Sequence, residues 1–429
     1  EAIMKVSRRT LLKAGALAGM APAFAMARPE RETPQQKLGP SFDKLKPLGK
    51  RVQPITAEEY AGRLALARRF MGDAKPAFAA LYVTPGTSLY YYTGIRWWPS
   101  ERLLALLVPR KGDPVVICPA FEEGRLRELL PWPMEVRVWQ EDESPYEVAA
   151  KWLAERGIRT GRIAVEERTT FAFYDGLRRA AHALEYASAD PVTIGCRAQK
   201  TDHELDLMRL SCEATIDVYR AVFAALQTGM TQYDVAGLVA DGFTRMGLEG
   251  GALVLFGKWA AQPHGTREPQ RLEEGQVVLM DGGTTVEGYQ SDITRCTVLG
   301  QAPDKVKRAF TLVRQAQDAA LMAAVTGHEC GSVDNAARAV LTNAGFGPGY
   351  KFFTHRLGHG IGLDGHEWPY LVKGNHTSLV TGMTFSNEPG IYVPGDYGLR
   401  LEDDMVIAET GEARLLTPGF STSLEKPVD

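Results

Sequence analysis

The sequence predicts a two-domain protein of the α+β class, in which an α/β domain precedes an α+β domain. The chain has 429 residues, which exceeds the usual size of one domain. Strand-like and helix-like segments alternate between about residues 57 and 190, whereas they are grouped after about residue 200. With 45% hydrophobic residues, the chain can fill two hydrophobic cores.

Composition excludes several classes of protein. The formal net charge is -3, and no basic cluster with interleaved aromatic residues is present, so nucleic acid is not an expected partner. The five cysteines form no C-x-x-C pair, which argues against a zinc ribbon or a redox motif. An odd number of cysteines in a long chain predicts free, buried thiols.

The N-terminus predicts an exported protein. Arg8 and Arg9 precede a short Ala- and Gly-rich apolar run that ends at Ala25-Met26-Ala27. This run is too short to span a bilayer, and its pattern is typical of a signal peptide over residues 1–27. The paired arginines favour the twin-arginine route to the periplasm, with no stable membrane insertion after cleavage. A retained anchor or a cytoplasmic protein with an unusual tail remains the alternative.

Residues 28–56 are rich in Pro, Lys and Gln, and we expect them to form an extended linker. The first domain is expected over residues 57–195. Apolar runs predict strands near 77–83, 103–108, 114–118 and 162–165, and periodic segments predict helices near 57–71, 121–130, 146–156 and 172–182. No Gly-rich phosphate loop opens these helices, which argues against a nucleotide site.

The second domain is expected over residues 196–429. Amphipathic periodicity predicts helices near 203–226, 233–246, 304–325 and 333–344. Glycine-punctuated apolar runs predict strands near 277–281, 290–298, 383–388 and 400–407. This domain also carries an unusual set of acidic and histidine residues on apolar, strand-like sequence.

Two aspartates form the first part of that set. Asp281 ends the run Val-Val-Leu-Met-Asp, and Asp292 follows after a Gly-rich segment that can turn the chain back as a hairpin. The two carboxylates would then lie side by side, about 5 Å apart at the backbone. Buried carboxylates so close cannot both remain ionised without a positive charge between them, and divalent metal ions are the simplest candidates.

Two glutamates repeat the arrangement. Glu388 and Glu402 flank a segment with two Pro-Gly pairs, and His355, His359 and His366 fall in a Gly-rich tract of twelve residues just before them. Each piece alone is a weak signal, but together they form an oxygen-rich site with imidazole. Such a site suits two divalent ions, Mn(II) first, with Co(II) or Zn(II) as alternatives.

The order and spacing of these segments resemble the pita-bread metallopeptidases, which include prolidase, aminopeptidase P and methionine aminopeptidase. The matching segments are Asp281 to Asp292, His355-x-x-x-His359-x-x-Gly-Leu-Asp-x-His366, Asn-Glu388-Pro-Gly and Gly-x-Arg400-x-Glu402-Asp. His264 stands 17 residues before Asp281, where the family has a substrate-side histidine. The resemblance runs from about residue 56 to the C-terminus. It implies a creatinase-type first domain, with Tyr90-Tyr-Tyr-Thr-Gly94 as a matching segment.

The resemblance implies a role for each matching residue. Asp281 would bind one metal ion, and His359 and Glu388 the other. Asp292 and Glu402 would bridge both ions, and a hydroxide between the ions would be the nucleophile. Glu388 would also transfer a proton from the nucleophile to the leaving amine.

The remaining residues are expected to contact the substrate or support the metal site. His366 and His264 would stabilise the tetrahedral oxyanion, and His355 would line the pocket. Arg400 would either grip a substrate carboxylate or neutralise the surrounding carboxylates. Trp97 and Trp98 follow the Tyr-rich segment, where the family implies that a second subunit closes the pocket, so a homodimer is expected.

The implied function is hydrolysis of an Xaa-Pro bond at the N-terminus of short, proline-containing peptides, in the manner of prolidase or aminopeptidase P. Such a bond lacks an N–H, so a site that polarises the carbonyl directly suits it. Another amide or ester hydrolase on the same scaffold is the first alternative, and a catalytically inactive binding protein is the second. Methionine aminopeptidase is disfavoured by the large first domain. Creatinase is disfavoured because its reaction needs no metal.

Overall fold

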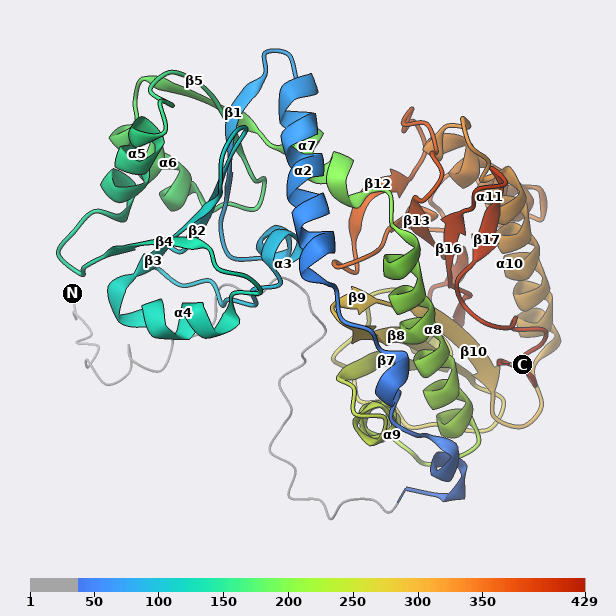
Figure 1. Ribbon diagram of the computed structural model, residues 1–429. Coiled ribbons are helices and arrows are strands. Elements are labelled where there is room, and N and C mark those ends of the chain that lie inside the picture. The colour runs from blue at the N-terminus through green and yellow to red at the C-terminus, as the bar shows by residue number, and fades with distance from the viewer. Residues whose placement is uncertain (1–37, 429) are drawn as a thin grey trace, which may run out of the picture.

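The computed structural model describes residues 38–428 and shows two domains, connected where helix α7 leads into helix α8 (Figure 1). The expected signal peptide, residues 1–27, lies outside the described residues, as do residues 28–37. The α/β and α+β character expected of the first and second domains is confirmed. Among the helices of residues 38–428, none has the length and apolar character needed to cross a bilayer.

The first domain is a mixed six-stranded sheet with helices on its faces. The strand order is β4-β3-β2-β1-β5-β6, with antiparallel pairing of β1 with β2 and of β2 with β3, and parallel pairing elsewhere. The strands are β1 (Phe78–Val83), β2 (Ala105–Pro109), β3 (Val115–Pro119), β4 (Glu135–Trp139), β5 (Gly161–Val165) and β6 (Leu184–Ser188). The helices are α2 (Ala57–Asp73), α3 (Thr87–Thr93), α4 (Glu123–Leu129), α5 (Pro145–Glu155), α6 (Phe171–Ala180) and α7 (Asp190–Arg197).

The inner strands were predictable because they are apolar runs that are fully buried in β2 and β3, nearly so in β1 and buried at the centre of β5, whereas β4 and β6 were not predictable. Both are edge strands whose residues are mostly half-exposed, so their sequences carry charged and polar residues in place of an apolar run. The start of α2 shows the opposite case. Thr56 accepts a hydrogen bond from the Glu59 N–H, and the Glu59 carboxylate accepts one from the Thr56 N–H, which is a capping box readable in sequence.

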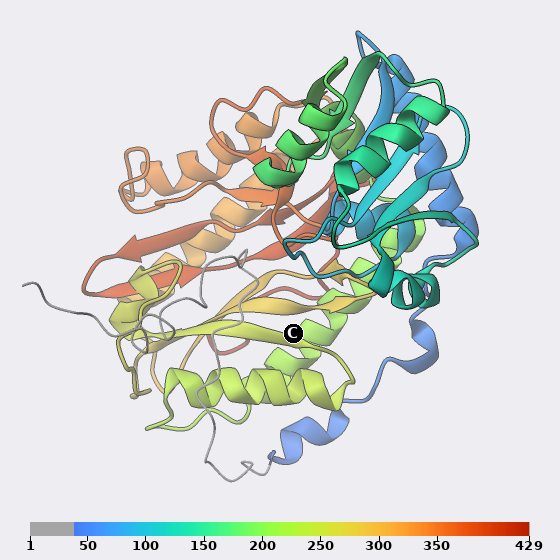
Figure 2. The ribbon, with the colours of Figure 1, turned by 90° about the vertical axis from the view of Figure 1, so that its left-hand side faces the viewer.

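The second domain has two larger sheets between two pairs of helices, together with the two-stranded sheet β14-β15, and this is the arrangement implied by the pita-bread resemblance (Figures 1 and 2). Helices α8 (Asp202–Phe223) and α9 (Gln232–Arg245) pack on the sheet β10-β8-β7, and α10 (Asp304–Ala323) and α11 (Cys330–Asn343) pack on the sheet β12-β11-β13-β16-β17. The first sheet contains β7 (Gly250–Phe256), β8 (Val277–Val286) and β10 (Ile293–Val298), and β9 (Tyr289–Gln290) pairs with β8. The second sheet contains β11 (Gly358–Gly360), β12 (Glu367–Leu371), β13 (Thr384–Asn387), β16 (Asp403–Ile407) and β17 (Ala413–Leu415), and β14 (Gly390–Val393) pairs with β15 (Tyr397–Arg400).

Residues 38–56 form more than a plain linker. They contain the short 3-10 helices η1 (Pro40–Lys44) and η2 (Gly49–Arg51), and η1 lies against α8. Phe42, Leu45 and Leu48 are buried in the large core cluster that also contains the inner face of α8. The Pro- and Lys-rich composition concealed these apolar anchors, which are too widely spaced to produce a helical or strand periodicity.

The five cysteines are free and buried, as the sequence predicted. Cys296 is fully enclosed, and its thiol donates a hydrogen bond to the Arg400 carbonyl over 3.2 Å. Burial raises the pKa of Cys296 to about 12, so this thiol packs as a small apolar group.

Candidate active site

Asp281 and Asp292 lie on the hairpin expected from the sequence. Strands β8 and β10 pair in antiparallel register, with Asp281 opposite Thr294 and Gly282 opposite Ile293. Asp292 directly precedes β10 and therefore reaches the same end of the hairpin. The two carboxylates come within ligand distance of one another, as the hairpin geometry predicts.

Glu388 and Glu402 meet at the corresponding end of the second sheet. Strands β13 and β16 are antiparallel, and Asn387 pairs with Asp403. Glu388 follows Asn387 and Glu402 precedes Asp403, so both glutamates leave the ladder at the same end. The β14–β15 hairpin, which contains the expected turns, connects them.

His359 occupies the short strand β11, between β12 and β13. A Cβ atom on Gly358 would lie 2.0 Å from the Ser386 carbonyl oxygen, and one on Gly360 would lie 2.5 Å from that of Trp368. Glycine on both sides therefore lets β11 pass closely between its neighbours. The Nδ1–H of His359 donates to the Gly360 carbonyl over 3.1 Å, which leaves the Nε2 lone pair free.

These five side chains form two overlapping groups of possible metal ligands. Within each group the ligand atoms lie within 4.8 Å of one another. The first group contains Asp281, Asp292 and Glu402, and the second contains His359, Glu388 and Glu402. His359 Nε2 lies 3.4 Å from a Glu388 oxygen and 4.0 Å from an Asp292 oxygen. Glu402 belongs to both of these groups, and a third group joins Asp292 to His359 and His366.

The charges in this cluster do not balance. Burial, together with the neighbouring carboxylates, raises the pKa of Asp292 and of Glu402 well above its usual range. Burial raises the pKa of Glu388 to about 8, against the opposing charge of Arg400. For Asp281, burial is outweighed by Arg400 and by hydrogen bonds, and its pKa is lowered. Four carboxylates, one buried and three half-buried, thus face one arginine, which leaves a local deficit of positive charge.

Two divalent cations fit this deficit. Carboxylate oxygens and one neutral imidazole are the donors that Mn, Co and Zn accept, and burial lowers the pKa of His359 well below its usual value, so its lone pair is available. The carboxylate of Glu402, which both groups share, would fit between two ions held close together. The donor set alone does not select one of these metals.

Arg400 is engaged inside the cluster. Its guanidinium donates to Asp281 Oδ2 over 2.5 Å, to the Tyr392 hydroxyl over 2.8 Å and to the Thr294 hydroxyl over 3.0 Å. Its side chain is 3% exposed. Of the two roles expected for Arg400, this geometry favours neutralisation of the carboxylates over contact with a substrate.

His355 belongs to the same hydrogen-bonded chain. The Tyr392 hydroxyl lies 2.7 Å from His355 Nε2, and His355 Nδ1 lies 2.7 Å from the Arg356 carbonyl oxygen. Because that carbonyl can only accept, Nδ1 carries the proton and Nε2 accepts from Tyr392. Burial, with the nearby charge of Arg400, lowers the pKa of His355 to about 3, so the ring is neutral.

His366 and His264 line the open side of the cluster. The ring of His366 stacks on that of His359 with centroids 3.7 Å apart, and it is exposed to solvent. The pKa of His366 is lowered by burial first and then by the charges of Arg356 and His264, which places His264 nearby. His264 is itself exposed. Contacts thus bring together eight of the nine residues proposed from sequence, and His264 lies close enough to lower the pKa values of His355 and His366.

Three supporting residues were not predicted. The Thr294 hydroxyl lies 2.7 Å from carboxylate oxygens of both Asp281 and Glu402. Asp404 accepts a hydrogen bond from the backbone N–H of Asp292 over 3.0 Å, and Arg295 donates to the Glu402 carbonyl over 2.8 Å. Thr294 could have been found, because residues two apart on a strand share a face and Asp292 stands two positions before it. The other two contacts depend on tertiary packing.

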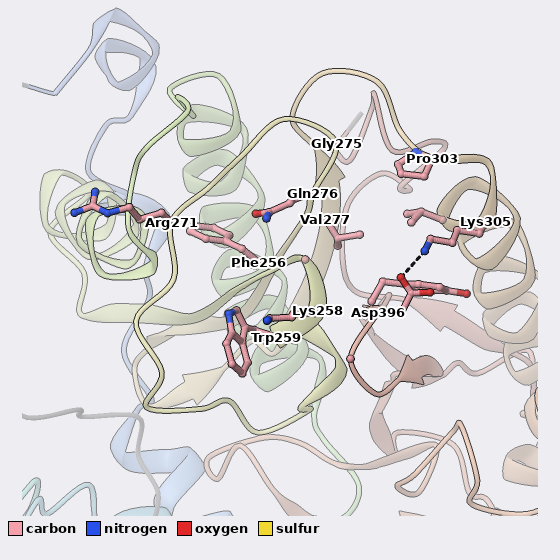
Figure 3. A pocket seen from close by; sticks show the side chains of 14 residues that line it. Phe256, Lys258, Trp259, Arg271, Gly275, Gln276, Val277, Pro303, Lys305 and Asp396 are labelled. Atoms are coloured by element: carbon pink, nitrogen blue, oxygen red, sulfur yellow. Dashed lines mark hydrogen bonds and ion pairs between the residues drawn. The ribbon is translucent and has the colours of Figure 1, made fainter.

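A separate cavity of about 450 Å³ lies at the other end of β8 (Figure 3). It lies between η4 (Gly257–Ala261), the start of α10 and the turn between β14 and β15, where Lys305 forms an ion pair with Asp396. Val277 at its wall is four residues before Asp281, or roughly 13 Å along the strand. None of the nine site residues lines this cavity.

Comparison with known proteins agrees with the two-domain structure. Residues 206–409 match Metallopeptidase family M24, and residues 63–199 match the Creatinase/Prolidase N-terminal domain. A probable dipeptidase PepE of Mycobacterium bovis is 37% identical over 360 residues, covering 83% of this chain and 94% of the relative. The chain belongs to metallopeptidase family M24.

Other M24 relatives are named dipeptidases. An Xaa-Pro dipeptidase of Lactobacillus helveticus is 34% identical over 340 residues, covering 77% of this chain and 90% of the relative. The crystal structure of dipeptidase PepE from Mycobacterium ulcerans superposes with a TM-score of 0.78 at 35% identity, covering 85% of this chain and 97% of that chain. The chain is therefore a pita-bread metallopeptidase with a creatinase-type first domain, as the sequence resemblance implied. M24 membership also implies divalent metal ions.

Proposed function

We propose that this M24 enzyme hydrolyses the Xaa-Pro bond of short peptides, with dipeptides as its main substrates, at a centre of two divalent ions. The observation that carries the proposal is the pair of overlapping ligand groups that share Glu402. In this proposal Asp281, Asp292, His359, Glu388 and Glu402 hold the two ions. The names of the relatives support the proline and dipeptide parts.

The residues around the centre have distinct chemical tasks. Divalent ions bound here would activate water and polarise the substrate carbonyl. Glu388 lies beside His359 in the second ligand group, where its carboxylate can take a proton from the activated water and pass it to the leaving amine. His366 and His264 stand on the solvent side, where an imidazole N–H can donate to an oxyanion. Arg400, through Tyr392, keeps His355 in one tautomer.

A proline-specific reaction is consistent with such a centre. The Xaa-Pro amide has no N–H, so an enzyme that grips that group loses a contact. A centre that acts on the carbonyl does not depend on it. The choice of metal, Mn(II) or Co(II) or Zn(II), follows availability as much as the donor set.

A peptide panel with stripped and reloaded enzyme tests the proposal. Chelator-treated protein is given Mn, Co or Zn and then Ala-Pro, Ala-Pro-Ala or Ala-Ala. We expect activity to return with metal and to be highest on Ala-Pro. Cleavage of Ala-Ala with neither proline peptide cut, in metal-loaded protein, would refute proline specificity. An unchanged rate in Asp292→Ala would refute the ligand assignment.

Export and dimerisation belong to the same proposal. The twin-arginine pattern before residue 28 supports delivery of folded, metal-loaded enzyme to the periplasm. Trp98 is 79% exposed and Phe121 is 64% exposed, and such apolar surface supports a homodimer contact through the first domain. The domains proposed from sequence are 57–195 and 196–429; α7 (Asp190–Arg197) crosses this boundary, and its last residues, Arg197 included, belong with the first domain.

A further inference from the structure

A dipeptide carries a free carboxylate next to the scissile bond, and a selective enzyme needs a cation to bind it. Arg400 has its donors occupied by Asp281, Tyr392 and Thr294. Arg197 and Lys200 are paired with Glu367. These cations near the centre are therefore committed to other partners.

Arg356 differs from them. It follows His355 and stands three residues before His359, at the entry to β11. Its guanidinium lies over the ring of Tyr370, 4.2 Å from the ring centroid. Tyr370 pairs with His359 across β11 and β12, so Arg356 is held on the strand pair that carries the histidine.

The Arg356 side chain makes no hydrogen bond or ion pair within residues 38–428. Its side chain is half-buried, so its charge is partly desolvated without a carboxylate to balance it. A guanidinium stacked on an aromatic face keeps its edge free for a bidentate acceptor. The donors of Arg356 are thus unused, although the side chain is held in place.

The positive charge of Arg356 affects the pKa values of three side chains at the proposed metal centre. Burial is the main reason that the pKa values of His359 and His366 fall, and Arg356 adds to both shifts. Arg356 also opposes the rise that burial causes in the pKa of Glu388. Cross-strand partners project from the same face of a sheet, so Arg356, which lies over Tyr370, is on the face of the β11–β12 pair that carries His359.

We propose that Arg356, stacked on Tyr370, binds the free C-terminal carboxylate of a dipeptide and thereby makes the enzyme prefer dipeptides to longer peptides. This assignment rests on the proposed peptidase function of the same site. Tyr370 acts as the platform that fixes the plane of the guanidinium. A longer peptide would place a neutral amide opposite Arg356. The guanidinium would then lack a charged partner, which disfavours binding of the longer peptide.

The test compares Ala-Pro with Ala-Pro-amide, which differ only in the charge of that terminus. In wild-type enzyme, kcat/KM for Ala-Pro should exceed that for the amide on the order of 100-fold, the usual effect of losing one partner of a desolvated charge pair. Arg356→Leu should bring this ratio close to one, mainly by raising KM for Ala-Pro. Arg356→Lys, which keeps the charge but not the fork, should retain an intermediate ratio.

Free proline and prolinamide provide a readout that does not depend on turnover. Proline should inhibit the wild-type enzyme more strongly than prolinamide does, and Arg356→Leu should remove that difference. Metal content per chain, measured in each variant, controls for damage to the neighbouring His359.

The outcomes separate the two proposals. If metal-loaded wild-type enzyme cleaves neither Ala-Pro nor its amide, the proposed function fails. If wild-type enzyme cleaves Ala-Pro, but Arg356→Leu retains its metal and lowers kcat/KM equally for Ala-Pro and for its amide, the assignment of Arg356 is wrong and the proposed function stands. A wild-type enzyme that treats acid and amide alike would also overturn the assignment. Arg96 of the first domain, whose guanidinium lies 4.6 Å from the centroid of the Tyr90 ring, is the rival cation. If Arg96→Leu abolishes the preference for Ala-Pro over its amide while Arg356→Leu keeps it, the carboxylate is bound by the first domain and the assignment of Arg356 is wrong.

Discussion

At the scale of single residues, the hydroxyl of Thr294 lies between Asp281 and Glu402 and accepts a hydrogen bond from Arg400. One fully buried hydroxyl thus orients two proposed ligands and the arginine that neutralises them. Residues that orient metal ligands commonly affect metal affinity or activity as much as the ligands do.

Thr294→Val should therefore lower metal affinity or kcat by about 10- to 100-fold while the fold is kept, because valine has nearly the same shape. The measurement is activity as a function of free Mn(II). Thr297→Val is the matched control on the same strand, since the Thr297 hydroxyl donates to the Leu424 carbonyl away from the site. Equal effects of the two substitutions would contradict the role given to Thr294.

Glu166 provides a residue-scale prediction for pH. It is 5% exposed, and burial raises its pKa to about 7, although Ser88 and the Arg168 N–H donate to it. Between pH 4.5 and 7 the folded state binds more protons than the unfolded state, so stability falls as pH rises. The shift corresponds to about 3 kcal/mol at most.

Glu166→Gln should remove this pH dependence. The difference in stability between the variant and wild type should therefore shift in favour of the variant from pH 5 to pH 8. Urea unfolding midpoints at the two pH values give the comparison. Glu185→Gln, at an exposed position on the neighbouring strand, should show no such gain. The prediction would be contradicted if the unfolding midpoint changed by the same amount between pH 5 and pH 8 in wild type and in Glu166→Gln.

At the scale of elements, strand β11 positions His359 because glycines flank it. Gly360→Ala would place a Cβ atom 2.5 Å from the Trp368 carbonyl oxygen, which is backbone and cannot move aside easily. We expect loss of most bound metal and a lower unfolding midpoint. Gly124→Ala in α4 has open space around the new Cβ, and stability there should stay the same or rise by up to about 1 kcal/mol. A fully metal-loaded Gly360→Ala variant would show that β11 is less constrained than the contacts indicate.

The same elements show what sequence could predict. The hairpin that carries Asp281 and Asp292 was predictable, because a glycine-rich turn separates two apolar runs and pairing follows from strand geometry. Strand β11 was not, because three residues of Gly-His-Gly have no periodicity. Nor could sequence show whether Arg400 faces substrate or carboxylates, since that depends on which donors tertiary packing occupies.

At the scale of the whole molecule, a buried ion network joins the two domains beside the site. Arg197 of α7 donates to Asp364 over 2.7 Å and to Glu367 over 2.5 Å, and Lys200 donates to Glu367 over 2.6 Å. Asp364 and Glu367 flank His366 in sequence. The first domain thereby holds the loop that presents His366.

Arg197→Met should lower the free energy of unfolding by about 3–5 kcal/mol, because it leaves buried carboxylates with less compensation. It should also lower kcat, since the loop that carries His366 is released. Arg209→Met is the matched control, because its pair with Asp206 is 45% and 68% exposed and should contribute less than about 1 kcal/mol. Similar losses of stability in both variants would argue against a special role for the network.

The central claim is that five side chains hold two divalent ions with Glu402 shared between them. The most direct test is the metal content per chain after loading with Mn(II) and dialysis, for wild type, Glu402→Gln and Glu412→Gln, the last at an exposed position. We predict two ions per chain in wild type and in Glu412→Gln, and fewer than one in Glu402→Gln. One ion or none in wild type, or two in Glu402→Gln, would contradict the account.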